Sequence, residues 1–136
     1  MGYGARCVGD MRAVDTNVLV RLLTRDDPKQ ADAAEAFVAG GAWVSHLALV
    51  EAAWVLDAVY GLPASRIARA IDMLLDHRDL VLQDAQTVAA ALALFRERPK
   101  LGFADCMMIE TARRAGHLPL GTFDRTLARV AGAQRL

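Results

Sequence analysis

Short apolar runs alternate along the chain with longer stretches in which apolar residues recur every three or four positions. The short runs predict β-strands, and the longer stretches predict amphipathic helices. Four strands are expected, at Arg12–Asp15, Ala42–Ser45, Leu80–Leu82 and Leu118–Thr122, with Val130–Leu136 as a candidate edge strand. Helices are expected at residues 16–24, 28–39, 46–60, 64–76, 84–98 and 103–115, and Asp124 opens a short last helix.

This alternation is typical of βα units, which build a parallel sheet with helices on both faces. Right-handed crossovers bring the carboxyl ends of such strands to one rim of the sheet. We therefore expect an α/β fold, with one Rossmann-like three-layer domain around a central, mainly parallel sheet of four to five strands. The domain is expected over residues 11–136. Residues 1–10 show neither the periodicity of a strand nor that of a helix, and they are expected to be an N-terminal extension that is disordered or non-native.

The composition supports one folded domain without an obvious charged partner. The chain has 136 residues, of which 54% are hydrophobic and 24% charged, and this argues against disorder. Sixteen basic and sixteen acidic residues give a net charge of zero. Any contact with RNA or DNA must therefore come from a local patch rather than from a global field.

The cysteines and the hydropathy indicate where the protein works. Cys7 and Cys106 form neither a metal-binding pair nor a disulfide framework, so a reduced, cytoplasmic setting is expected. The one stretch apolar enough to suggest a membrane span is Phe37–Leu56. It contains Gly40–Gly41, Ser45, His46 and Glu51, so we expect a loop, a strand and a helix, and no membrane association.

Four acids occupy positions that suggest chemistry. Asp15 ends the first predicted strand, Asp124 follows the fourth, and Asp105 lies in the first turn of its helix. Open α/β folds bind their ligands at the carboxyl rim of the sheet, and these positions can share that rim. Glu51 is expected on an apolar helix face with Leu47, Trp54 and Val55, where an unpaired charge is costly.

Carboxylates that converge without a cationic partner need protons or a divalent ion. Hard oxygen ligands select Mg²⁺ or Mn²⁺, and the corresponding chemistry is phosphoryl transfer by metal-activated water. Each acid also has a structural explanation. Asp15 and Asp124 are possible helix caps, and Asp105 complements a helix dipole. The joint occurrence of all four acids favours the metal site.

The motifs resemble those of the PIN (PilT N-terminus) domain family, and within it the VapC-type ribonuclease toxins. The resemblance rests on four segments, taken in order: Val14–Leu19, Ser45–Glu51, Gly102–Cys106 and Thr122–Asp124. It implies a Mg²⁺- or Mn²⁺-dependent endoribonuclease that leaves a 5′-phosphate and a 3′-hydroxyl. It also implies that the catalytic, metal-ligating residues are Asp15, Glu51, Asp105 and Asp124, with Thr122 and Asn17 as supporting hydrogen-bond partners.

The resemblance further implies three partners: an RNA substrate, a second copy in a homodimer, and a small antitoxin protein that fills the active-site groove. Lysine is scarce, so RNA binding would depend on arginines, for which the candidates are Arg21, Arg25, Arg96, Arg98 and Arg113. A DNA-directed nuclease of the same family is a remaining alternative.

Three rival functions use the same fold class. A phospho-accepting receiver domain needs an acceptor, which Asp84 would supply, and a lysine after the last strand, but no lysine follows Lys100. A catalytically silent PIN-like domain would keep the fold only to bind a partner. A dinucleotide-binding module needs a glycine-rich turn after the first strand, and Asp15-Thr16-Asn17 has none.

Overall fold

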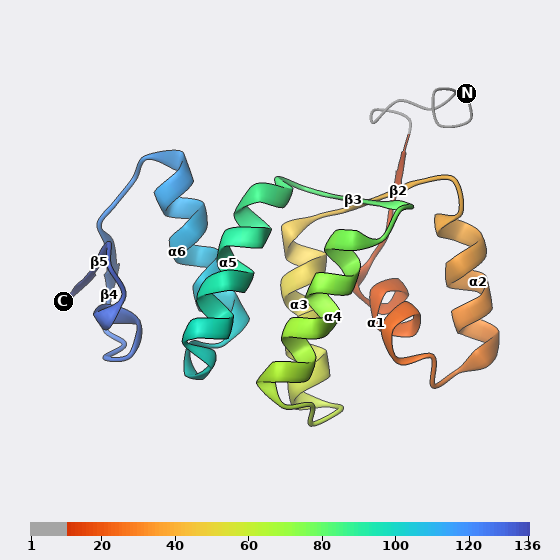
Figure 1. Cartoon of the computed structure of the whole chain (residues 1–136), viewed down its shortest axis with the longest axis horizontal. Helices are drawn as coiled ribbons and strands as arrows, with labels where there is room; N and C mark the ends of the chain where they lie inside the picture. The colour runs from red at the N-terminus through yellow and green to blue at the C-terminus, as the bar shows by residue number, and fades with distance from the viewer. Residues whose placement is uncertain (1–10) are drawn as a thin grey trace.

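The computed structural model describes residues 11–136, and the extension predicted at residues 1–10 lies outside them. Strands and helices alternate as expected (Figure 1). The strands are β1 (Arg12–Ala13), β2 (Ala42–Val44), β3 (Leu80–Leu82), β4 (Leu120–Thr122) and β5 (Ala133–Arg135). The α-helices are α1 (Thr16–Thr24), α2 (Pro28–Val38), α3 (His46–Ala58), α4 (Ala64–Asp76), α5 (Ala85–Glu97) and α6 (Phe103–Ala115).

The polar residues at the helix starts explain why the helices begin where they do. Asp15, Asp27, Ser45 and Asp84 are N-caps, and the side chain of each accepts a hydrogen bond from a backbone N–H in the first turn. Pro28 follows Asp27 at the first helical position, where its missing N–H costs nothing. The predicted start of α2 is therefore confirmed.

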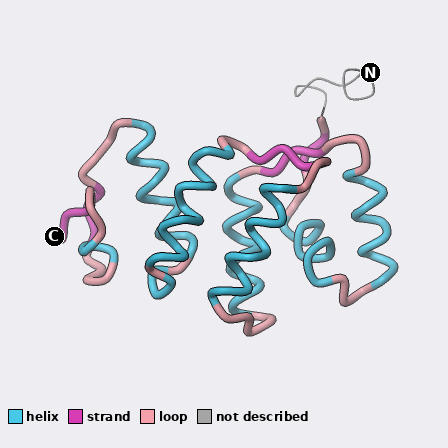
Figure 2. The backbone as a smooth tube through the Cα atoms, viewed as in Figure 1, coloured by secondary structure: helices cyan, strands magenta, loops and turns pink. Residues whose placement is uncertain are grey.

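The strands are parallel, but they form two sheets. One has the order β1-β2-β3, and the other pairs β4 with β5. The α/β class and the parallel strands are confirmed, whereas the single central sheet of four to five strands is corrected to one sheet of three strands and one of two. In Figures 1 and 2 helices α5 and α6 stand between the two sheets. An apolar run predicts that a short strand forms, but it does not specify with which other strand it pairs.

The core lies among the helices and the inner face of the three-stranded sheet. Its fully buried side chains include Leu19 of α1, Leu49 and Leu56 of α3, Ile71 of α4 and Ile109 of α6. Helix α3 packs against α1, α4 and α6, so it is the central helix of the domain. None of the described helices is long and apolar enough to cross a membrane.

The predicted last helix is shorter than expected. Residues Leu127–Arg129 form a single 3₁₀ turn, after which β5 pairs with β4. The candidate edge strand at residues 130–136 is thus confirmed as β5, over fewer residues.

Candidate active site

Asp15 lies two residues after β1, an edge strand of the three-stranded sheet. The preceding Val14 is buried, and its N–H donates to the carbonyl oxygen of Trp43 at 3.1 Å, so the backbone is fixed by the sheet. Asp15 itself is exposed, and its Oδ1 accepts the N–H of Val18 at 3.1 Å. One carboxylate oxygen therefore caps α1, and the other, Oδ2, makes no hydrogen bond with the described residues.

Glu51 lies beside the start of α1. The hydroxyl of Thr16 donates to Glu51 Oε2 at 3.2 Å, which joins the first predicted motif to the second. The expectation that Glu51 shares a buried apolar face is wrong: Glu51 is exposed, and Leu47 and Trp54 are 68% and 65% exposed. Helix α3 is apolar on almost every side, so its periodicity did not distinguish the buried face from the open one.

Asp105 and Asp124 form a second pair of carboxylates. Asp105 lies in the first turn of α6 and is half-buried. Burial raises the pKa of its carboxyl, and repulsion from Asp124 raises that pKa further. Asp124, 19 positions further along the sequence, is thus close enough to disfavour the charge of Asp105. Neither makes an ion pair with any described residue.

The backbone after β4 holds Asp124 in place. Its N–H donates to the hydroxyl oxygen of Thr122 at 3.0 Å. Its Oδ1 accepts the N–H groups of Thr126 at 2.8 Å and Leu127 at 2.9 Å. Thr122 therefore supports Asp124 through the backbone. Asn17, the other predicted supporting residue, is exposed on α1 and makes no side-chain hydrogen bond within residues 11–136.

The four acids do not meet at one point. No three side chains of Asp, Glu, His or Cys within the described residues lie close enough to hold one metal ion. Asp15 and Glu51 flank Thr16 at one end of α1, whereas Asp105 and Asp124 face each other across α6 and the end of β4. Helix α3 packs against α6, so Glu51 and Asp105, one acid from each pair, lie on neighbouring helices.

The oxygen atoms nevertheless suit a hard divalent ion. In Asp15, Glu51 and Asp124 one oxygen is fixed by the protein and the other is free of partners in the described part of the chain. Asp105 accepts no side-chain hydrogen bond there, and burial together with the charge of Asp124 raises the pKa of its carboxyl. Carboxylate oxygens are the ligands that Mg²⁺ and Mn²⁺ prefer. The four carboxylates are therefore suitable ligands for these ions, but the described conformation separates them into two pairs.

Most of the arginines that were expected to contact RNA form ion pairs with acidic side chains of the protein. Arg21 pairs with Asp26, and Arg25 with Glu35 and Asp32. Arg96 and Arg113 pair with Asp72 and Glu110, respectively. Of the five candidates, Arg98 alone makes no ion pair within residues 11–136, so it is the most available cation of that group.

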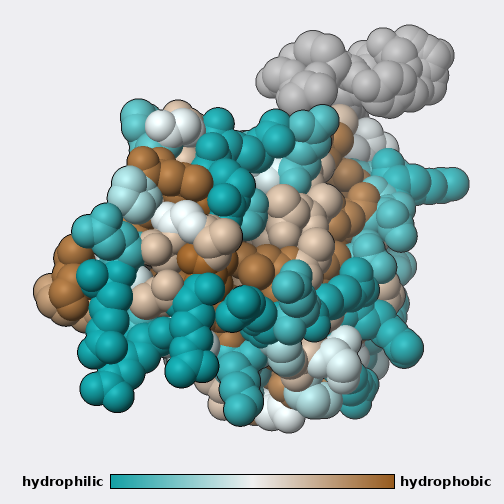
Figure 3. All heavy atoms as spheres, turned by 60° about the vertical axis from the view of Figure 1, so that its left-hand side comes forward, coloured by the Kyte–Doolittle hydropathy of each residue, from teal (hydrophilic) through white to brown (hydrophobic). Residues whose placement is uncertain are grey.

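Sequence reasoning missed two exposed groups near these acids. Phe123, next to Asp124, is 79% exposed, and Figure 3, which brings the side with β4 and β5 forward, shows hydrophobic side chains at the surface there. Asp57 lies in the last turn of α3, where the helix dipole disfavours an acid. An acid at the C-terminal end of a helix is unfavourable, and this feature of the sequence could have drawn attention to Asp57.

Asp84, the acceptor needed by a receiver domain, has a structural role. It caps α5 in a left-handed conformation, with φ of 39°. Its Oδ2 accepts the hydroxyl of Thr87 at 2.6 Å and lies 3.5 Å from the guanidinium of Arg114. These contacts lower the pKa of Asp84, so its carboxylate stays charged and in contact with Thr87 and Arg114. The receiver interpretation has no support from this arrangement.

The geometry can be compared with known proteins. Searches of curated proteins and of solved structures returned no significant match. The family model described as the PIN domain matches residues 12–133, which span all four predicted motifs and the strands β1 to β4. The chain therefore belongs to the PIN domain family.

Proposed function

We propose that the protein is a metal-dependent endoribonuclease that hydrolyses phosphodiester bonds of RNA. PIN domains are typically nucleases and generally use divalent metals. The observation that carries the proposal is the state of the four carboxylates. None has a cationic partner among the described residues, and three of them are anchored through one oxygen with the other free.

In this proposal Asp15, Glu51, Asp105 and Asp124 would hold Mg²⁺ or Mn²⁺, for which the two pairs must come closer together than in the described conformation. A bound ion of this kind lowers the pKa of a water ligand and stabilises charge on the leaving oxygen. Asp124, fixed by two backbone N–H groups, uses its free Oδ2 to orient the attacking water and accept its proton. Thr16 holds Glu51 in position, and the products carry a 5′-phosphate and a 3′-hydroxyl.

We further propose that the protein is the toxin of a VapBC-type toxin–antitoxin system, acts as a homodimer and is inhibited by an antitoxin. The resemblance of the four motifs to VapC-type toxins supports this role. Val59 and Met73 are 69% and 58% exposed, and such apolar side chains are suited to burial by a protein partner. Sedimentation of the purified protein, alone and with the antitoxin co-expressed, tests both associations.

Cleavage of end-labelled RNA tests the enzymatic proposal. We expect cuts with Mg²⁺ or Mn²⁺ that leave 5′-phosphates and disappear in EDTA and in Asp105→Asn. Calorimetric titration of the metal should show weaker binding to Asp105→Asn and to Glu51→Gln, because each variant removes one charge from a different pair. Failure to bind metal and to cut any RNA would instead favour a catalytically silent, partner-binding PIN domain.

A further inference from the structure

Phe123 is the most exposed large apolar side chain among the described residues, with 79% of its surface open to solvent. It lies between Thr122, which ends β4, and Asp124 of the proposed nuclease site. A single exposed apolar side chain needs no functional explanation by itself. The fixed backbone of Phe123 and the charge around it, however, suit the binding of a ligand beside Asp124.

Hydrogen bonds hold the backbone on both sides of Phe123. The carbonyl oxygen of Thr122 accepts the N–H of Leu136 at 2.9 Å, and the hydroxyl oxygen of Thr122 accepts the N–H of Asp124 at 3.0 Å. The carboxylate of Asp124 in turn accepts two backbone N–H groups of the turn that follows. The ring keeps only its own two side-chain torsions, so little conformational entropy is lost when a flat partner stacks on it.

Two arginines lie close to Phe123 in the fold. Arg125 follows Asp124 directly, and Arg135 on β5 is in register with Thr122 on β4. Neighbouring strands are about 4.8 Å apart, so the backbone of Arg135 lies beside the residue that supports Asp124. Both arginines are exposed, and neither makes an ion pair or a side-chain hydrogen bond within residues 11–136. They are therefore available to an anion that reaches Asp124.

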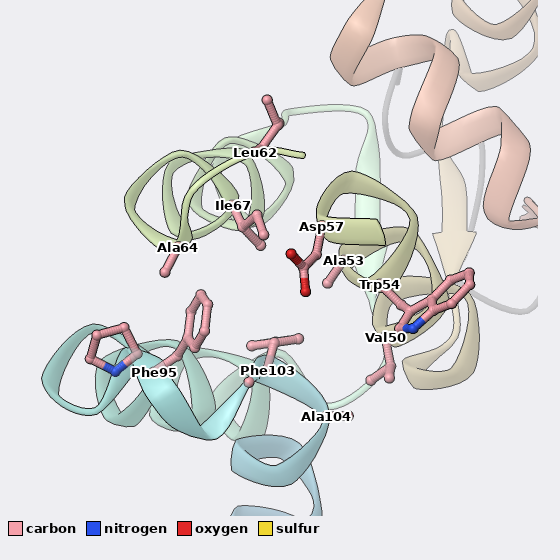
Figure 4. A pocket seen from close by; sticks show the side chains of 12 residues that line it. Val50, Ala53, Trp54, Asp57, Leu62, Ala64, Ile67, Phe95, Phe103 and Ala104 are labelled. Atoms are coloured by element: carbon pink, nitrogen blue, oxygen red, sulfur yellow. The ribbon is translucent and has the colours of Figure 1, made fainter. Parts of the chain in front are cut away.

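The charge on this side of the domain favours an anionic partner. Asp124 is the only acidic side chain of residues 117–136, a segment that contains three arginines. The cavity between α3, α4 and the start of α6 differs, because its lining is mostly apolar and its one charged residue is the acid Asp57 (Figure 4). A polyanion that approaches the site is therefore attracted to β4 and β5 rather than to that cavity.

An aromatic ring with free guanidinium groups close by matches the chemistry of single-stranded nucleic acid. Bases stack on the ring, and the guanidinium groups contact the phosphates. An acidic protein segment can pair with the arginines, but its carboxylates carry no flat group that would cover the ring. Each phosphate of RNA, in contrast, belongs to a nucleotide with a base, so RNA satisfies both features together.

We propose that Phe123 stacks on one unpaired base of the RNA substrate, while Arg125 and Arg135 contact adjacent phosphates and position the strand at Asp124. The inference rests on the proposed nuclease function and adds residues that position its substrate. A base inside a duplex is already stacked on its neighbours, so this contact requires an unstacked nucleotide. Every base has a π-face, so stacking on Phe123 positions the strand without selecting a sequence.

Fluorescence anisotropy with a labelled oligouridylate in EDTA tests the stacking contact, because it measures binding without cleavage. Phe123→Leu keeps an apolar side chain but removes the π-face, and it should weaken binding about tenfold. Phe123→Trp keeps an aromatic ring and should bind at least as tightly as the wild type. An oligomer of the same length without bases should bind equally to the wild type and to Phe123→Leu, because it has nothing to stack.

The salt dependence of binding tests the two arginines. Arg125→Gln and Arg135→Gln should each reduce the slope of log K against log salt concentration by about 0.7, the value for one phosphate of a single strand. Arg66→Gln is the matched control, since Arg66 on α4 is also exposed and makes no ion pair among the described residues. It should leave the slope unchanged. Circular dichroism confirms that each variant is folded.

The outcomes separate this inference from the proposed nuclease. Metal-dependent cleavage, with normal RNA binding by Phe123→Leu, leaves the nuclease standing and overturns the stacking site. Equal weakening of both oligomers in Phe123→Leu also overturns the site, as does a wild type that fails to bind oligouridylate. Base-dependent binding that Phe123→Leu removes, in a protein that cuts no RNA, supports the site and refutes the nuclease. Dissociation of a dimer by Phe123→Leu, with RNA binding unchanged, identifies a protein contact and overturns the stacking site.

Discussion

Asp124 combines a structural contact with a proposed catalytic role, and two substitutions separate them. Asp124→Asn keeps an oxygen that can accept the N–H groups of Thr126 and Leu127, whereas Asp124→Ala removes it. Both substitutions remove the negative charge that repels Asp105. The difference in stability between the two variants therefore isolates the contribution of the cap.

The magnitude follows from the contacts. Loss of a capping acceptor costs about 1 kcal/mol, and relief of an exposed like-charge contact returns about 0.5 kcal/mol at most. Asp124→Ala is expected to be destabilised by roughly 0.5–1 kcal/mol, and Asp124→Asn to be neutral or slightly stabilised. For a domain of this size the melting temperatures of the two variants should differ by roughly 3–6 °C.

The assay combines thermal melting in EDTA with RNA cleavage in Mg²⁺. Both variants should lose at least about 100-fold in cleavage rate, because a charged group at the reacting centre is gone. Full activity in Asp124→Asn would show that Asp124 only caps the turn. Equal melting temperatures of the two variants would refute the structural half of the argument.

Three further outcomes are expected. Because the folded-state pKa of Asp105 is raised, its charge destabilises the fold at neutral pH, so Asp105→Asn should melt higher than the wild type in EDTA. The difference should shrink as the pH falls below that raised pKa and vanish below the ordinary pKa of an aspartate in the unfolded chain. Glu51→Gln should keep its melting temperature, since an amide oxygen can still accept from Thr16, while cleavage is lost. Burial raises the pKa of Cys106 to about 12, so in a Cys7→Ser protein a thiol reagent at pH 8 should react only after denaturation.

The sequence was sufficient to predict most of the elements, because their signals are local. Polar caps such as Asp27 and Ser45 precede apolar periodicity, and each begins a helix in the structure. The position of Asp15 after an apolar run also predicted its place at the sheet edge. Such features depend on neighbours within one turn of the chain, so a single sequence contains them.

The sequence was not sufficient where the outcome depends on distant segments. Tryptophan side chains are usually buried, yet Trp54 is 65% exposed. Helix α3 is apolar on nearly all sides, so the elements that pack against it decide which of its sides is covered. Pairing between strands has the same limitation. The run at Leu120–Thr122 predicts a strand, but its pairing with Ala133–Arg135 rather than with β1 is a property of the whole fold.

The split into two sheets gives the two carboxylate pairs different structural supports. Asp15 is attached to the three-stranded sheet and Asp124 to the two-stranded one, while Glu51 and Asp105 lie on the packed helices α3 and α6. Any ligand that contacts both pairs must therefore be held across the junction of these helices. Alignment of a phosphodiester between the two pairs therefore depends on the packing of α3 against α6.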